Sequence, residues 1–103
     1  MLDTTPLTAA VDRFADHLRA APQSRLQRGA AAEALALARE LATRAQRLEA
    51  PDAPPHEMPD AGMFAAADQI TVAAHDLAVA LTDPAQLAEA VLLVEEAQKR
   101  AGV

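Results

Sequence analysis

Residues 61–81 read AGMFAAADQITVAAHDLAVAL, and this stretch decides the fold because its apolar residues occupy two sides of one predicted helix. The first side is a stripe at helical spacing that comprises Met63, Ala67, Ile70, Ala74, Leu77, Ala78 and Leu81. The second side carries Phe64, Val72 and Val79, with Asp68 and His75 set among them. A helix on the surface of a protein normally has one apolar arc. Two arcs predict a helix that is enclosed by its own bundle or that makes a further interface.

The composition of the whole chain also favours helix. Alanine supplies 28 of the 103 residues and leucine 13, whereas valine and isoleucine together supply 7. Ala and Leu are strong helix formers, while strands prefer β-branched and aromatic side chains. A chain of this length suits one domain over residues 1–103. Eight arginines against one lysine, together with the alanine excess, indicate a bacterial genome rich in G and C.

Prolines, glycines and capping residues divide the chain into four predicted helices. Their ranges are about 6–20, 25–49, 61–81 and 84–100. Asp60 and Asp83 stand where the N-caps of the last two helices are expected, and Gly102 suits the end of the fourth. The economical arrangement of four such helices is an all-α antiparallel four-helix bundle.

The predicted connections differ in length. The loop over residues 50–60 holds four prolines, which cannot lie inside a helix and which stiffen the segment. It could also serve as a short proline-rich ligand. The joints over residues 21–24 and 82–83 are short, so the helices on either side of each joint are expected to be neighbours.

Charge is divided unevenly between the two halves of the chain. Residues 1–50 hold seven arginines and six acids, for a charge of +1, whereas residues 51–103 hold nine acids against Lys99 and Arg100, for −7. We therefore expect the arginine-bearing half to pack beside the acidic half. The chain has two aromatic residues and no basic patch, so no nucleic-acid partner is expected.

Several classes of site are not expected from the residue types present. The chain has no cysteine, which excludes disulfides and thiolate metal sites. No secretory signal and no apolar stretch of membrane-spanning length is recognisable, so a cytoplasmic location and no membrane partner are expected. No pair of Glu-x-x-His motifs, glycine-rich phosphate loop or nucleophile triad is present. We accordingly predict no metal, cofactor or catalytic residue.

One polar cluster leaves an enzymatic alternative open. Glu33, Glu40, Arg44 and Arg47 line one edge of the second predicted helix. Paired carboxylates beside arginines can perform acid/base chemistry. The same pattern forms ordinary salt bridges, with Glu40 and Arg44 in the favourable i, i+4 order, and this interpretation is preferred.

A second alternative rests on His75. The stretch Ala73-Ala74-His75-Asp76-Leu77, followed by Leu87 and then Val94-Glu95-Glu96-Ala97, resembles the core of histidine phosphotransfer domains. The resemblance covers about a quarter of the chain. It implies a four-helix bundle in which His75 is an exposed phosphoacceptor. The family usually has Lys and Gly three and four positions after the histidine, where this chain has Ala78 and Val79.

The surplus of apolar residues favours a non-enzymatic function. An alanine-rich core buries little area per side chain, and self-association would add to it. We therefore predict a helical bundle that acts through protein contacts, as a homodimer or with another helical protein. The predicted contact residues are Phe64, Val72 and Val79, with Leu92 and Leu93 of the fourth helix behind them.

Overall fold

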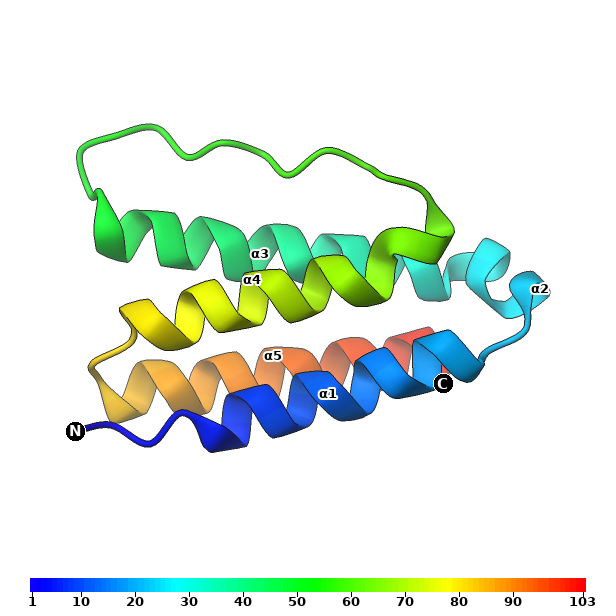
Figure 1. Ribbon diagram of the computed structural model, residues 1–103, viewed down its shortest axis with the longest axis horizontal. Helices are drawn as coiled ribbons and strands as arrows, with labels where there is room; N and C mark the ends of the chain where they lie inside the picture. Colours follow the sequence, from blue (N-terminus) through cyan, green and yellow to red (C-terminus); the bar gives the residue numbers. More distant parts are fainter.

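The protein is an all-α four-helix bundle, as predicted (Figure 1). The computed structural model describes all residues from Met1 to Val103. In chain order the elements are α1 (Thr5–Ala20), α2 (Gln23–Arg25), the π turn η1 (Leu26–Ala30), α3 (Ala31–Glu49), the 3₁₀ turn η2 (Met63–Ala65), α4 (Ala66–Ala80) and α5 (Pro84–Ala101). The four long helices α1, α3, α4 and α5 form the bundle, and their C-terminal ends agree with the prediction to within one residue. Helices α3 and α4 begin six and five residues later than predicted, because the turns η1 and η2 precede them.

The core is apolar throughout, since none of its 25 buried residues is polar or charged. Each long helix contributes at least one fully buried large side chain: Phe14, Leu41, Ile70 and Val94. Thirteen of the 25 buried residues are alanines, so the helices approach one another closely but each side chain removes little area from water. The inner stripe predicted for residues 63–81 faces this core, with Ile70 and Leu77 buried at its centre.

The helices are not ordered round the bundle as the short joints suggested. The contacts between neighbours are α1 with α4, α4 with α3, α3 with α5, and α5 with α1. Helices α1 and α3 therefore lie diagonally across the bundle, and so do α4 and α5. The prediction that a short joint makes its two helices neighbours is wrong at both places.

Local backbone geometry explains both diagonal crossings. After α4, Leu81 is buried and extended (φ −69°, ψ 134°), so the chain passes across the end of the bundle before Asp83 starts α5. Between α1 and α3 the chain bends at Gly29, which has φ 151° and ψ −15° inside the π turn. A side chain at that φ would be strained, and glycine is the residue that tolerates it.

Chain direction also differs between the sides of the bundle. Helices α3 and α4 run parallel, as do α1 and α5, whereas the α1–α4 and α3–α5 contacts are antiparallel (Figure 1). A parallel pair of neighbours needs a connection that returns along the whole first helix. The 19 residues of α3 measure roughly 28 Å, and residues 50–62 in extended form reach about 40 Å. We call residues 50–62 the strap.

The strap lies on α3 and is held there by polar contacts. The Gln46 side chain binds both the backbone carbonyl (3.1 Å) and the backbone N–H (2.6 Å) of His56. Arg39 donates to the carbonyl oxygen of Met58 at 2.8 Å and lies 3.6 Å from the Glu57 carboxylate. The proline-rich segment is therefore fixed to α3 at residues 56–58 and covers part of the outer surface of that helix.

The helix ends show which capping predictions hold. Asp83 is the N-cap of α5 and accepts a hydrogen bond from the N–H of Ala85 at 2.9 Å, and Gly102 ends the helix in the left-handed conformation. Asp60 is not an N-cap, because it accepts from Gly62 in a turn before η2. Before α1, hydrogen bonds from Thr5 lower the pKa of the Asp3 carboxyl from its ordinary value of 3.8.

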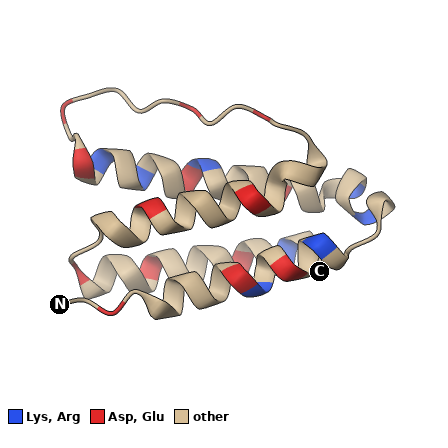
Figure 2. Ribbon diagram, viewed as in Figure 1, with Lys and Arg blue, Asp and Glu red and all other residues tan.

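Ion pairs join the two halves of the chain as the charge division predicted. Figure 2 shows where the basic and acidic residues lie along the chain. Three of them link an arginine of residues 1–50 to an acid of residues 51–103: Arg19 with Asp68, Arg39 with Glu57, and Arg44 with Glu89. All involve exposed or half-exposed side chains, so each contributes little to stability. The Arg19–Asp68 pair joins α1 to α4 and the Arg44–Glu89 pair joins α3 to α5, whereas the Arg39–Glu57 pair joins α3 to the strap. None of the helices combines the length and apolar character that a membrane crossing requires.

Candidate functional site

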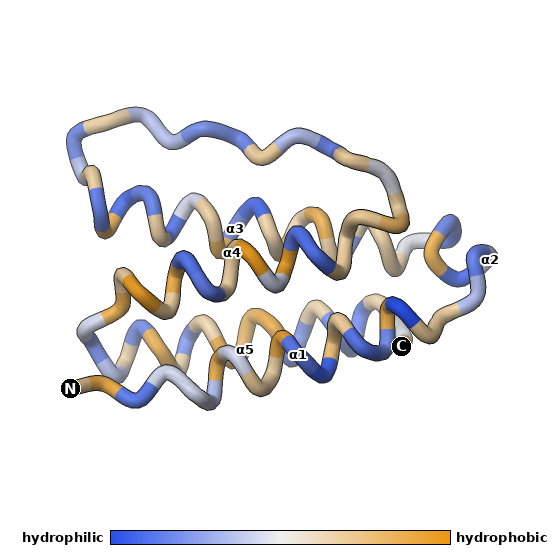
Figure 3. Tube along the Cα trace, viewed as in Figure 1, coloured by the Kyte–Doolittle hydropathy of each residue, from blue (hydrophilic) through white to orange (hydrophobic).

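The outward side of α4 and of the preceding turn carries one continuous stripe of side chains. Its members are Phe64, Asp68, Val72, His75 and Val79, spaced four, four, three and four residues apart. Helical geometry places them within an arc of about 80°. We call this stripe the α4 face. The helix is hydrophobic on most of its turns, in keeping with apolar residues on both its inner and outer sides (Figure 3).

The three apolar members of the α4 face are open to solvent. Phe64 is 72% exposed, Val72 57% and Val79 85%. Single exposed hydrophobic residues are common on protein surfaces, whereas an aligned group marks a contact surface more often. The structure thus brings these three predicted residues together on one surface.

The two polar members, Asp68 and His75, differ in how many of their side-chain atoms have a hydrogen-bond partner within the molecule. One oxygen of Asp68 accepts from Arg19 of α1 at 2.9 Å, and Arg19 also lies 3.6 Å from Asp16. The second oxygen of Asp68 makes no hydrogen bond, and the exposed imidazole of His75 makes none at all. The α4 face therefore carries a carboxylate oxygen and an imidazole that are both available to a partner.

The remaining predicted contact residues lie elsewhere. Leu92 is 55% exposed and points outward from α5, which is diagonal to α4. Leu93 is half-buried and packs against the core. It lies on the same edge of α5 as Glu89 and Arg100, which pair with α3. Leu92 and Leu93 are therefore not behind the α4 face and cannot extend it.

The polar edge of α3 forms salt bridges. Glu33 pairs with Arg100 of α5 at 2.9 Å, and Glu40 pairs with Arg44 at 2.9 Å. The two carboxylates thus hold different partners at different heights of α3. Seven residues, or about 10 Å along the helix, separate them, so they are not placed to act on one substrate. These contacts are the ordinary salt bridges that the sequence pattern favours.

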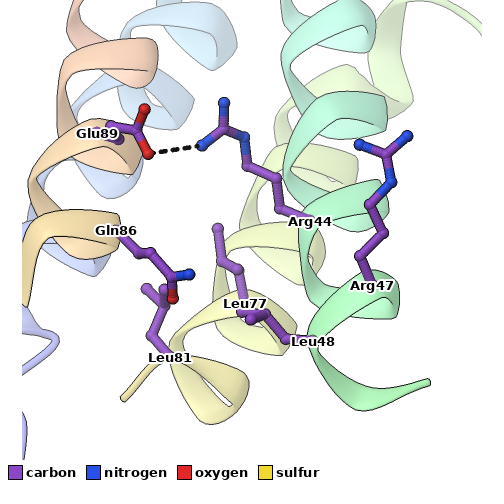
Figure 4. A pocket seen from close by; sticks show the side chains of 7 residues that line it. All are labelled: Arg44, Arg47, Leu48, Leu77, Leu81, Gln86 and Glu89. Carbon is purple, nitrogen blue, oxygen red and sulfur yellow. Dashed lines mark ion pairs between the residues drawn. The ribbon is translucent and has the colours of Figure 1, made fainter. Parts of the chain in front are cut away.

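A small pocket lies where α3 and α4 end and α5 begins (Figure 4). It holds about 190 Å³ and has an apolar floor of Leu48, Leu77 and Leu81. Arg44 reaches across it to Glu89, with 3.5 Å between guanidinium and carboxylate. Arg47, on the rim, has no acid within ion-pair distance. The positive charge of Arg47 therefore lies beside a pocket that is too small for most cofactors.

The other two histidines have structural contacts. The ring of His17 lies 3.2 Å from the side-chain amide of Gln98 and joins α1 to α5, while His56 is bound through its backbone in the strap. No group of three or more histidine and acidic side chains is placed to hold a metal ion. The rings of His56 and His75 thus make no hydrogen bond, and of these two residues His75 is the one that lies on a helix of the bundle.

Comparison with protein-family models, with curated proteins and with solved structures found no match to this chain. Sequence reasoning had found the α4 face from its spacing, but it had missed the Arg19–Asp68 contact. The partners of that contact are 49 residues apart, and nothing local to either marks them as a pair.

Proposed function

We propose that the protein functions through protein contact, as a homodimer whose subunits meet at the α4 face. The observation that carries this proposal is the alignment of Phe64, Val72 and Val79, all more than half exposed, on one side of a single helix. No part of the chain lies over them, whereas the strap lies over α3.

The energetics indicate a dimer of modest affinity. Full burial of a Val or Phe side chain contributes about 1.5–3 kcal/mol, and a symmetric dimer buries the three side chains of each copy. Association costs about 4–15 kcal/mol in lost freedom of the two molecules. The gain and the cost are of similar size, so we expect modest affinity, with a dissociation constant on the order of micromolar. Such an interface is suited to reversible, regulatory association.

Sedimentation equilibrium from low to high micromolar protein concentration tests the proposal. We expect a reversible monomer–dimer equilibrium that the Val79→Ser variant shifts to monomer. The matched control is Leu92→Ser, which replaces another exposed hydrophobic residue, on the diagonal helix, and should leave the equilibrium unchanged. A monomer at every concentration would refute the proposal. If Leu92→Ser weakened the dimer as much as Val79→Ser does, the α4 face would not be the dimer interface.

A second candidate function is phosphotransfer through His75, and the observation that supports it is the free, exposed imidazole on α4. In this reaction an imidazole nitrogen attacks the phosphorus of an acyl phosphate, the bond from phosphorus to the acyl oxygen breaks, and the carboxylate leaves with the electron pair of that bond. Incubation with acetyl phosphate would then add one acid-labile phosphoryl group to the chain. The His75→Gln variant should gain none, and an equal gain by that variant would exclude His75 as the acceptor.

A further inference from the structure

We propose that the second copy packs antiparallel on the α4 face, about a two-fold axis beside Val72, so that Asp68 of each copy meets His75 of the other. This inference rests on the proposed homodimer and specifies its geometry. It derives from the order of residues along the stripe and from two groups that make no hydrogen bond within one molecule, the second oxygen of Asp68 and the imidazole of His75.

The stripe is symmetric about its midpoint, which lies between Thr71 and Val72. Phe64 stands as far before this point as Val79 stands after it. Asp68 and His75 are likewise equidistant from it. When one helix is laid antiparallel on a second copy about this point, apolar residues face apolar residues at the centre and at both ends. The same patch thus serves both subunits, as a two-fold interface requires.

Charge separates the antiparallel arrangement from the parallel one. In an antiparallel pair the carboxylate of Asp68 lies opposite the imidazole of His75 from the other copy, and the two-fold axis produces this contact twice. In a parallel pair in register, Asp68 would face its own equivalent, which is unfavourable for like charges. The oxygen of Asp68 that Arg19 leaves free can accept from an imidazole N–H.

The neighbouring helix α1 supports the same arrangement. Helices α1 and α4 are antiparallel, and Arg19 of α1 contacts Asp68 of α4. His75 lies two turns after Asp68, and Asp12 lies two turns before Arg19, so Asp12 and His75 are at the same height along the bundle. In the two-fold dimer, Asp12 of one copy therefore stands level with Arg19 of the other. Asp16, near the height of the axis, is paired with Arg19 of its own copy at 3.6 Å.

Disulfide trapping tests the arrangement, and the absence of cysteine from the chain makes single-cysteine variants unambiguous. Under a mild oxidant we expect the Val72→Cys variant to form covalent dimers. The Phe64→Cys and Val79→Cys variants should each fail to link alone but should link when mixed. In the antiparallel pair the two copies of position 64 are roughly 22 Å apart along the helix, far beyond disulfide reach. Linking in the mixture shows that neither substitution has itself abolished association.

A charge substitution provides an independent measurement. The His75→Asp variant places a carboxylate opposite Asp68 at two symmetric contacts, and the dissociation constant should rise about tenfold. His75→Gln retains an N–H donor and should change the constant by much less. An equal effect of the two substitutions would contradict the Asp68–His75 contact.

The possible outcomes test the antiparallel geometry and the proposed homodimer separately. Self-linking of the Phe64→Cys variant would indicate a parallel dimer, which overturns the inference and leaves the proposed function standing. A dimer that no cysteine on the α4 face can trap would overturn both the geometry and the choice of surface. A monomer at high micromolar concentration would overturn the proposed function itself.

Discussion

Helices α3 and α4 are parallel neighbours with similar inner faces and different outer ones. Both bury large side chains completely, Leu41 in α3 and Ile70 in α4. On the outside, α3 presents Arg39 and Gln46, which hold the strap against it. On its outside α4 presents three exposed hydrophobic side chains and no segment of the chain above them.

The difference follows from the route of the chain. A parallel connection has to return along one of the two helices that it joins, and here it returns along α3 (Figure 1). The short joint after α4 crosses the end of the bundle and leaves the outer side of that helix bare. The strap therefore serves α3 as an internal partner, whereas the α4 face can be covered by another molecule.

The largest effect on stability is expected from substitutions in the core, which test whether the inner faces of α3 and α4 are equivalent. Leu41→Ala and Ile70→Ala should each lower the free energy of unfolding by about 2–5 kcal/mol, because each leaves a cavity in a fully packed core. Urea denaturation followed by circular dichroism, at a concentration where the monomer dominates, measures both. If one substitution is tolerated while the other unfolds the protein, the inner faces of α3 and α4 do not contribute equally to stability.

An intermediate effect is expected at the strap. Gln46→Ala removes both hydrogen bonds to His56, and the free energy of unfolding should fall by about 1 kcal/mol because the site is exposed. A glutamate-specific protease should then cleave faster after Glu57, as followed by mass spectrometry. The control Gln27→Ala removes an exposed glutamine whose side chain makes no hydrogen bond. Unchanged cleavage in Gln46→Ala would show that the strap is held by other contacts.

The smallest effect is expected on the outer side of α4. In the monomer, Val79→Ser should change the free energy of unfolding by no more than about 0.5 kcal/mol, because the side chain is already in water. The same substitution at the buried Val94 should cost more than about 2 kcal/mol. Thermal denaturation of the two variants at low concentration gives both values. A large loss from Val79→Ser would mean that this side of α4 supports folding rather than binding.

Features that depend on a few adjacent residues were predictable from the sequence. Helical spacing located the inner stripe and the outer arc of residues 61–81, and local chemistry identified Asp83 and Gly102 as caps. The order of the helices was not predictable, because a three-residue joint can either turn back beside a helix or cross the bundle end, as the buried Leu81 does here. Arg39 and Gln46 gave no sign of their role, since their hydrogen bonds to the strap go to backbone atoms, which are the same for every residue type.

The diagonal placement of consecutive helices has a consequence for how the molecule can fold. Residues 1–50 contain α1 and α3, which lie across the bundle from each other, and residues 63–103 contain α4 and α5, which do the same. Neither half can therefore assemble a core before the other half is present, and the two halves must interleave in one cooperative step. Separate peptides of the two halves should each remain unstructured and should gain helix only when mixed.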